Sequence, residues 1–143
     1  MHIGIPREVK SFENRVGMTP ASVREAVADG HTVTVETNAG HTIGFDDAQY
    51  EAAGAKIAAT AKDTFDNAEM IVKVKEPQPE EIGMLRDGQI LFTYLHLTKL
   101  KFLSQHTIKK SLYYLKDLLE QEKQDLLSIC LGIFLKKEKN LSL

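Results

Sequence analysis

Apolar and polar positions alternate with two different periods along the first 98 residues of the chain. Short runs rich in valine, isoleucine, leucine and threonine have the pattern of strands, whereas stretches with apolar residues three or four apart have the pattern of helices. The expected strands lie at 2–6, 31–37, 56–58, 70–77 and 88–96, and the expected helices at 20–30, 46–54, 61–68 and 79–86. A helix between successive strands indicates crossover connections, so we predict an α/β fold with a parallel sheet and flanking helices.

Residues with strong positional preferences mark the ends of the expected helices. Thr19 followed by Pro20 is typical of a helix start, because the threonine side chain can cap free N–H groups and proline suits the first turn. Gly30 stands where the same helix is expected to end, since glycine adopts the left-handed conformation of a C-cap without strain. For the next helix, Asp46 and Asp47 are both possible N-caps.

Charge and composition exclude several classes of protein. The 143 residues carry a net charge of −2, so neither a nucleic-acid site nor a basic membrane-binding patch is expected. The single cysteine, Cys130, cannot form an internal disulfide, which suits the cytoplasm. No apolar run is long enough to span a bilayer, and the histidines have no metal-ligand spacing. We therefore expect a cytoplasmic protein with no metal site.

The composition changes abruptly near residue 98. Residues 1–98 contain 9 basic and 15 acidic residues, together with every alanine, valine, arginine and proline of the chain. Residues 99–143 contain 9 lysines and 5 acidic residues and are rich in leucine. The leucines that fall at helical spacing predict a helical C-terminal tail, mainly between 109 and 131. We treat 1–98 and 99–143 as two parts of the chain.

Three residues with complementary chemistry follow the ends of expected strands: Arg15, Lys75 and His96. Ligands of open parallel sheets bind beyond the carboxyl ends of the strands, so we expect these three side chains to converge there. An arginine can bind a carboxylate with two parallel hydrogen bonds, a lysine can polarise a carbonyl oxygen, and a histidine can exchange a proton near neutral pH. The trio predicts a site for a small α-keto or α-amino acid. Of the two lysines in KVK, Lys75 is the candidate, and at least one is expected simply to face solvent.

No segment has the pattern of a dinucleotide-binding loop. The segment NAGHTIG, 38–44, has two glycines but not the spacing G-x-G-x-x-G that lets the backbone approach a pyrophosphate. We therefore expect that this chain does not bind NADH.

Three long motifs give the chain a family resemblance: IGIPREVKSFENRVGMTPASV (3–23), VKVKEPQPEE (72–81) and LRDGQILFTYLHL (85–97). Together they closely resemble the N-terminal, substrate-binding part of NAD-dependent alanine dehydrogenases, over residues 1 to about 98. The α subunit of nicotinamide nucleotide transhydrogenase shares the opening motif but differs at KVKEP and YLHL. The resemblance implies a Rossmann-like fold for residues 1–98.

The resemblance also implies a reaction and residue roles. The family converts L-alanine, NAD⁺ and water into pyruvate, ammonium and NADH. By resemblance Arg15 binds the substrate carboxylate, Lys75 engages the pyruvate oxygens and His96 transfers a proton. The cofactor implied is NAD, and the full-length family forms homo-oligomers.

After residue 98 the sequence departs from the family pattern. An alanine-rich helix and a complete NAD-binding domain would follow in the family, and residues 99–143 do not resemble them. We expect a truncation or a frameshift near residue 98, and hence a substrate-binding part that is inactive alone. Two alternatives stay open: a non-catalytic remnant, or a transhydrogenase-like nucleotide module.

Overall fold

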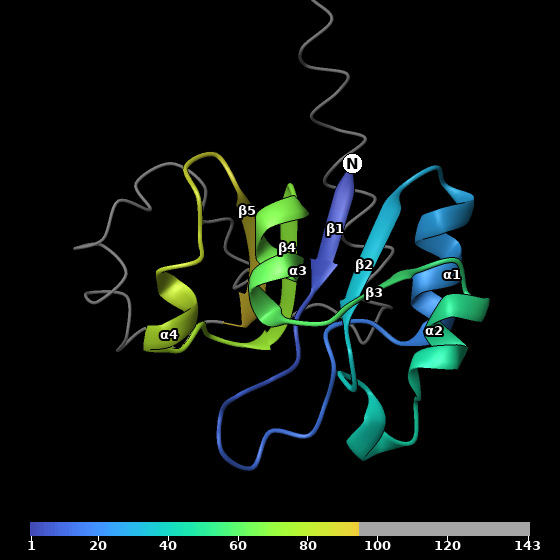
Figure 1. Cartoon of the computed structure of the whole chain (residues 1–143), viewed down its shortest axis with the longest axis horizontal. Helices are drawn as coiled ribbons and strands as arrows, with labels where there is room; N and C mark the ends of the chain where they lie inside the picture. The colour runs from blue at the N-terminus through green and yellow to red at the C-terminus, as the bar shows by residue number, and fades with distance from the viewer. Residues whose placement is uncertain (95–143) are drawn as a thin grey trace, which may run out of the picture.

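The computed structural model describes residues 1–94 as four short α-helices, one 3₁₀ turn and five strands (Figure 1). The strands are β1 (His2–Ile5), β2 (Thr32–Glu36), β3 (Lys56–Ala58), β4 (Met70–Lys75) and β5 (Ile90–Tyr94). The helices are α1 (Pro20–Ala28), α2 (Asp47–Ala52), α3 (Ala61–Asn67) and α4 (Pro79–Ile82), with the 3₁₀ turn η1 at His41–Ile43. His96 and the expected helical tail lie outside the described residues.

All five strands belong to one sheet with the order β3-β2-β1-β4-β5. Every pairing is parallel: β1 pairs with β2 and β4, β2 with β3, and β4 with β5. The predicted α/β fold with a parallel, Rossmann-like sheet is therefore confirmed. Because the chain runs outward from β1 through β2 to β3 and then returns to β4, the order reverses between β1 and β4. Such a reversal opens a crevice at the carboxyl ends of the two central strands.

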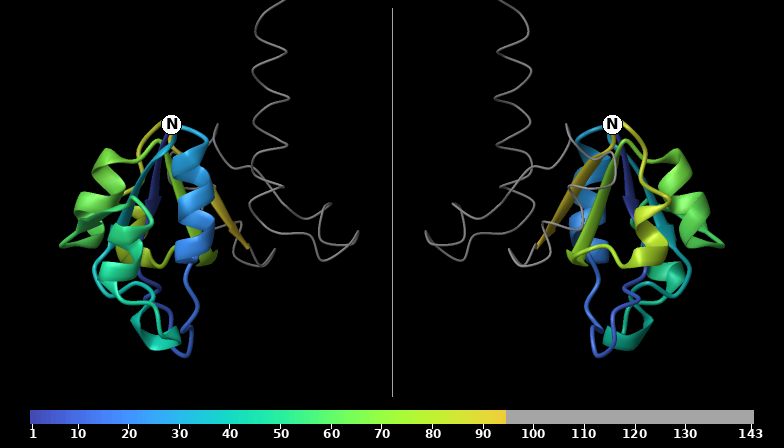
Figure 2. Two further views of the ribbon diagram at one scale, coloured as in Figure 1. Left: turned by 90° about the vertical axis from the view of Figure 1, so that its right-hand side faces the viewer. Right: turned by 90° about the vertical axis from the view of Figure 1, so that its left-hand side faces the viewer.

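The central strand β1 divides the core into two layers, because its side chains alternate between the faces of the sheet. Ile3 and Ile5 belong to the larger apolar cluster, which includes Val23 and Ala26 of α1. Gly4 faces α3, where an added Cβ would lie 2.8 Å from the Cβ of Ala68. Helices α1 and α3 accordingly cover opposite faces of the sheet (Figure 2). Only a residue without a side chain lets α3 approach β1 this closely.

The second, smaller apolar cluster lies between α3 and the β4–β5 side of the sheet. Phe65 and Ala68 from the α3 region pack there with Ile71 of β4 and Leu91 of β5, all at most 2% exposed. A parallel strand covered on both faces needs apolar residues at consecutive positions, as β4 has in Met70, Ile71 and Val72.

The starts of α1 and α2 follow the sequence expectations, and the second decides one open alternative. Thr19 is the N-cap of α1, and its hydroxyl accepts the N–H of Ser22 at 3.3 Å. Asp46, rather than Asp47, caps α2, in a capping box with Gln49. Asp47 instead accepts the Thr37 hydroxyl and the Asn38 N–H, so it fastens α2 to the end of β2.

The helix expected at 79–86 is shorter than predicted, since α4 ends at Ile82. Beyond it the backbone continues as turns, with the Met84 N–H bonded to the Glu81 carbonyl and the Leu85 N–H to that of Ile82. Met84 and Leu85 pack against the cluster of Phe65, Ile71 and Leu91. Packing of these two side chains thus prevails over continuation of the helix. Within residues 1–94, no helix has the length and hydropathy needed to cross a membrane.

Gly30 follows the C-cap residue Asp29 and ends α1 in the left-handed conformation that its position predicts. It has a φ of 84°, and its N–H bonds to the Val27 carbonyl while the His31 N–H reaches the Ala26 carbonyl. These two bonds define a Schellman motif. We expect Gly30→Ala to lower the free energy of unfolding by about 1 kcal/mol, because alanine is strained at positive φ.

Gly83→Ala is the matched control for this prediction. An added Cβ meets nothing within 4 Å at either glycine, but Gly83 has a φ of −67°. Alanine there should be neutral or stabilising by about 0.5 kcal/mol, since it restricts the unfolded chain. Chemical denaturation of both variants measures the difference, and equal effects would contradict the role of backbone conformation.

Candidate functional site

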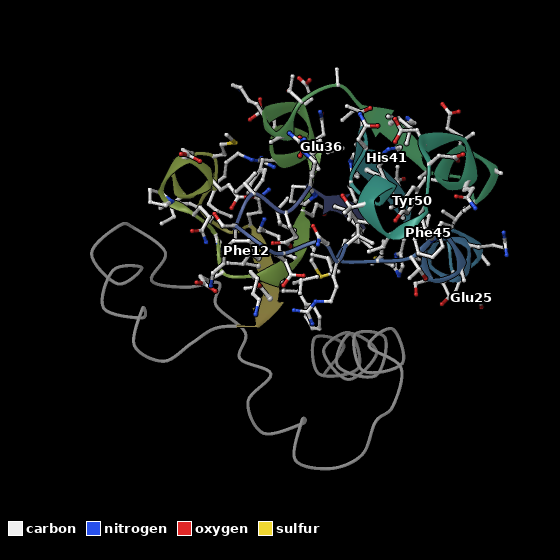
Figure 3. All side chains as sticks on the ribbon, turned by 90° about the horizontal axis from the view of Figure 1, so that it is seen from below. Phe12, Glu25, Glu36, His41, Phe45 and Tyr50 are labelled. Atoms are coloured by element: carbon white, nitrogen blue, oxygen red, sulfur yellow. The ribbon has the colours of Figure 1, made fainter. Side chains whose placement is uncertain are left out.

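A charged loop, residues 6–19, joins β1 to α1 and lies beyond the carboxyl end of β1, where the strand order reverses (Figure 1). Figure 3 looks onto this edge of the molecule, with Phe12 of the loop and Glu36 at the end of β2 labelled. The loop turns back at residues 10–13, where the Glu13 N–H bonds to the Lys10 carbonyl at 3.1 Å. Phe12, the third residue of this turn, has a φ of 65° and is fully exposed. The turn leaves Phe12 in solvent and brings the Glu13 side chain inward, where only 6% of it is exposed.

Glu13 and Arg15 form a bidentate ion pair. The Arg15 Nε donates to Oε1 of Glu13 at 2.8 Å and Nη2 donates to Oε2 at 2.6 Å. The Arg15 backbone N–H donates to the same Oε1 at 3.0 Å. Two parallel bonds fix the plane of the guanidinium as well as its position.

Lys75 reaches the same carboxylate from the end of β4. Its Nζ lies 3.9 Å from Oε2 of Glu13, which is an ion pair but longer than a hydrogen bond. The structure therefore brings Arg15 and Lys75 together at one carboxylate, although they are 60 positions apart in the sequence. His96 lies outside the described residues. Sequence reasoning missed Glu13, and the signal that could have found it is the acid two residues before the candidate arginine in ENR.

The two cations change the ionisation of Glu13. Hydrogen bonds from the Arg15 side chain lower the pKa of the Glu13 carboxyl from 4.5 to about 2, with a smaller contribution from Lys75. The same hydrogen bonds raise the pKa of Arg15 above its usual value. Glu13 is consequently an anion and Arg15 a cation throughout the physiological pH range.

Other charges fasten the loop to the ends of β2 and β4. Lys10 binds Glu76 at 2.8 Å. The Arg7 backbone N–H donates to the buried carboxylate of Glu36 at 2.8 Å. Glu8 accepts the Val74 N–H at 2.7 Å through Oε1. Each link joins a loop residue to a strand end, so the loop that carries Arg15 has a defined position over the sheet.

A register shift in β4 separates its two lysines. Val72 pairs with Phe92, but Lys75 rather than Val74 pairs with Tyr94, so β4 contains one extra residue between these pairs. Such a bulge interrupts the ladder and redirects side chains. It lies where Glu8 accepts the N–H of Val74.

Lys73 is buried, contrary to the expectation that at least one lysine of KVK faces solvent. Only 1% of its side chain is exposed, and its Nζ lies 2.6 Å from Oε1 of Glu81 and 3.5 Å from Oε2 of Glu8. Lys75 is also partly covered, with 25% of its side chain exposed. The expectation was wrong because β4 lies inside the sheet, and because carboxylates from the loop and α4 compensate the buried ammonium.

Burial raises the pKa of Glu8, while the nearby Lys73 ammonium and the hydrogen bond from the Val74 N–H oppose this shift. Glu8 and Glu13, five residues apart in one loop, are therefore shifted in opposite directions. Desolvation dominates at the first residue and hydrogen bonds from Arg15 dominate at the second.

The residues beside this site do not fit the pyrophosphate of a dinucleotide. Pro20 at the start of α1 has no N–H, the Ser22 N–H bonds to the Thr19 hydroxyl, and the Val23 N–H bonds to the Thr19 carbonyl. The first turn of α1 thus offers few free donors to a phosphate. Among residues 1–94 no cluster of three or more His, Cys, Asp or Glu side chains could hold a metal ion.

Comparisons with known proteins agree with one another. The family model described as alanine dehydrogenase/PNT, N-terminal domain, matches residues 4–128, which extends past the composition change at 98. Alanine dehydrogenase from Methanococcus maripaludis is 56% identical over 97 residues, and that from Bacillus subtilis 54% identical over 97. These matches cover 68% of this chain but 26% and 25% of the relatives. The chain therefore spans about a quarter of the length of these curated relatives.

Two solved structures are similar to the described fold. An L-alanine dehydrogenase matches with a TM-score of 0.73 at 47% sequence identity. The match covers 78% of this chain and 31% of the dehydrogenase chain. A transhydrogenase from Sinorhizobium meliloti matches with a TM-score of 0.63 at 33% sequence identity. The match covers 66% of this chain and 28% of the transhydrogenase chain. Both the sequence and the structural similarity are greater for the dehydrogenase.

The shifted ionisation of Glu13 can be tested by NMR. A folded-state pKa below the ordinary value means that the ion pair stabilises the fold fully above about pH 4.5 and is lost as the pH falls through about 2. We expect the Glu13 carboxyl carbon to titrate near pH 2, and Arg15→Met to return it toward its ordinary range. Arg7→Met, at the other loop arginine, should leave it unchanged. An ordinary midpoint in the unaltered chain would contradict the ion pair.

The buried Lys73 should matter far more to stability than an exposed lysine. We expect Lys73→Met to lower the free energy of unfolding by about 3–5 kcal/mol, because it leaves carboxylates buried without their cation. Lys62→Met is the matched control, since Lys62 pairs with Asp66 on the surface of α3. Its effect should stay within about 0.5 kcal/mol in chemical denaturation near pH 7. Similar effects of the two substitutions would show that Lys73 is not compensated as described.

Proposed function

The chain belongs to the alanine dehydrogenase/PNT N-terminal domain family, and from this premise we propose that it forms the substrate-binding part of an NAD-dependent alanine dehydrogenase. The small molecules bound are then L-alanine and pyruvate. The observation that carries the proposal is the convergence of the Arg15 guanidinium and the Lys75 ammonium on one carboxylate at the edge where the strand order reverses. Two cations of different geometry at this place suit a small acid with a carboxylate and a neighbouring oxygen.

Each residue has a distinct part in the proposed reaction. Arg15 binds the substrate carboxylate through two hydrogen bonds, and Lys75 donates to the carbonyl oxygen of pyruvate, drawing electrons from the carbon that is reduced. His96 follows β5 in the sequence and, by family resemblance, exchanges the proton. NAD supplies the hydride chemistry of this family. The first turn of α1, next to Arg15, offers few free N–H groups to its pyrophosphate.

The proposal extends to the setting in which the chain works. The family resemblance favours association of several copies, and the charge and cysteine content favour the cytoplasm. Under the alternative of a transhydrogenase-like nucleotide module, the same chain would bind NADH. A titration of NADH fluorescence separates the two proposals, and we expect no saturable change.

Binding of oxamate tests the substrate site directly, because oxamate has the carboxylate and neighbouring oxygen of pyruvate but does not react. We expect the 143-residue chain to bind oxamate and Arg15→Lys to weaken binding by at least about tenfold, since lysine cannot form the bidentate pair. Arg7→Lys is the matched control: Arg7 lies in the same loop but pairs with Glu36 and should leave affinity within about twofold.

Isothermal titration calorimetry measures these affinities. An equal loss of oxamate affinity in Arg15→Lys and Arg7→Lys would show that the effect comes from the loop in general and not from Arg15. Absence of saturable oxamate binding to the unaltered chain would contradict the proposed function itself.

A further inference from the structure

Glu13 is the central member of the site, yet the proposed function gives it no task. Its carboxylate contacts both proposed substrate-binding cations, at 2.6 Å from Nη2 of Arg15 and 3.9 Å from Nζ of Lys75. With 6% of its side chain exposed, Glu13 lies behind Arg15, which is 63% exposed. A carboxylate therefore already occupies part of the place that a substrate carboxylate would seek.

The geometry leaves one side of the guanidinium available. An arginine has five N–H donors, and Glu13 takes the one on Nε and one of the two on Nη2. Within residues 1–94, no other group accepts a hydrogen bond from the Arg15 side chain. The remaining donors on Nη1 and Nη2 form a second fork, on the edge of the guanidinium away from Glu13. Glu13 thus fixes the inner edge of Arg15 while the outer edge can bind a ligand.

The charge balance sets how many anionic groups the site can accept. Arg15 and Lys75 carry two positive charges, and Glu13, with its pKa near 2, cancels one of them. The other charged side chains of the loop have partners of their own, Lys10 with Glu76, Arg7 with Glu36 and Glu8 with Lys73. One positive charge remains for the ligand. A ligand with a single carboxylate at Arg15 neutralises it. A second anionic group beside the Lys75 Nζ, which lies 3.9 Å from Oε2 of Glu13, would be repelled by that carboxylate.

We propose that Glu13 is a positioning and specificity-determining residue, which orients Arg15 through the inner edge of its guanidinium and restricts the site to small acids with one carboxylate. This inference rests on the proposed function, because it concerns the same site. It names the accepted substrate class as 2-oxo or 2-amino monocarboxylates and the rejected class as their dicarboxylate counterparts. Glu13 acts through Arg15 and Lys75 and takes no part in bond making.

Two ligands of almost equal shape separate charge from size. Oxamate carries one negative charge and oxalate two at neutral pH, and they differ only by an amide in place of a carboxylate. The unaltered 143-residue chain should prefer oxamate. Glu13→Gln keeps the size of the side chain and removes its charge, so it should raise the oxalate-to-oxamate affinity ratio roughly tenfold, as expected for one charge pair a few ångströms apart in a partly hydrated site.

Glu36→Gln is the matched control. It removes one carboxylate from the same edge of the sheet, where Glu36 pairs with Arg7 rather than with Arg15 or Lys75. The affinity ratio should stay within about twofold of the unaltered chain, as it should for Glu13→Asp, which retains the charge. If Glu13→Gln changes both affinities by the same factor, or if Glu36→Gln changes the ratio as much, the specificity role is wrong.

An NMR measurement on the unaltered chain tests the positioning role without any substitution. The Arg15 Nε–H should exchange slowly with water because it is bonded to Glu13, and it should remain so when oxamate binds the outer fork. Loss of that protection on adding oxamate would show that the ligand displaces Glu13, which overturns the inference. Failure of oxamate to bind at all would instead refute the proposed function, so the two failures are distinguishable.

Discussion

Charges that are removed from water must meet opposite charges or hydrogen-bond donors, and this constraint governs the edge of the sheet at which the chain is organised. The loop between β1 and α1 carries five charged side chains to that edge. Each contacts a partner: Arg7 meets Glu36, Glu8 meets Lys73, Lys10 meets Glu76, and Glu13 meets Arg15 and Lys75. Without such links a loop of this length would sample many conformations, because fixing it in one conformation costs entropy. The ion pairs therefore define both the path of the loop and the position of the candidate site.

The bulge in β4 gives its two lysines different environments. Lys73 lies in a buried cluster with Glu8 and Glu81, where it joins the loop to α4. Lys75 lies at the strand end with a quarter of its side chain exposed, and within residues 1–94 its Nζ forms the 3.9 Å ion pair with Glu13 but no hydrogen bond. A buried and fully paired lysine stabilises the arrangement around it, whereas a loosely paired, partly exposed lysine at a strand end is available to a ligand. The structure thus separates the supporting lysine from the candidate binding lysine, although only one residue lies between them.

The family relation and the site geometry support each other for a physical reason. A parallel sheet whose strand order reverses collects loop residues and strand ends at a single crevice. Arg15 arrives from the loop after β1 and Lys75 from the end of β4, the two strands that flank the reversal. The described residues hold these cations around a carboxylate, and the first turn of α1 beside them offers few free N–H groups to a pyrophosphate. The arrangement suits recognition of a small acid, and this is why the proposed task of the chain is substrate binding.

The sequence by itself determined the fold class, the five strands and the ends of α1, because these depend on local periods and on residues such as Thr19 and Gly30 whose preferences act over a few positions. It also indicated Arg15 and Lys75, since residues after strand ends must lie at one edge of a parallel sheet. Only the tertiary structure decided that α4 stops at Ile82, where Met84 and Leu85 turn into the core, and that Lys73 is buried. It alone identified Glu13 as the carboxylate between the two cations. These features depend on contacts between segments far apart in the chain, and no local pattern encodes which charge will meet which partner.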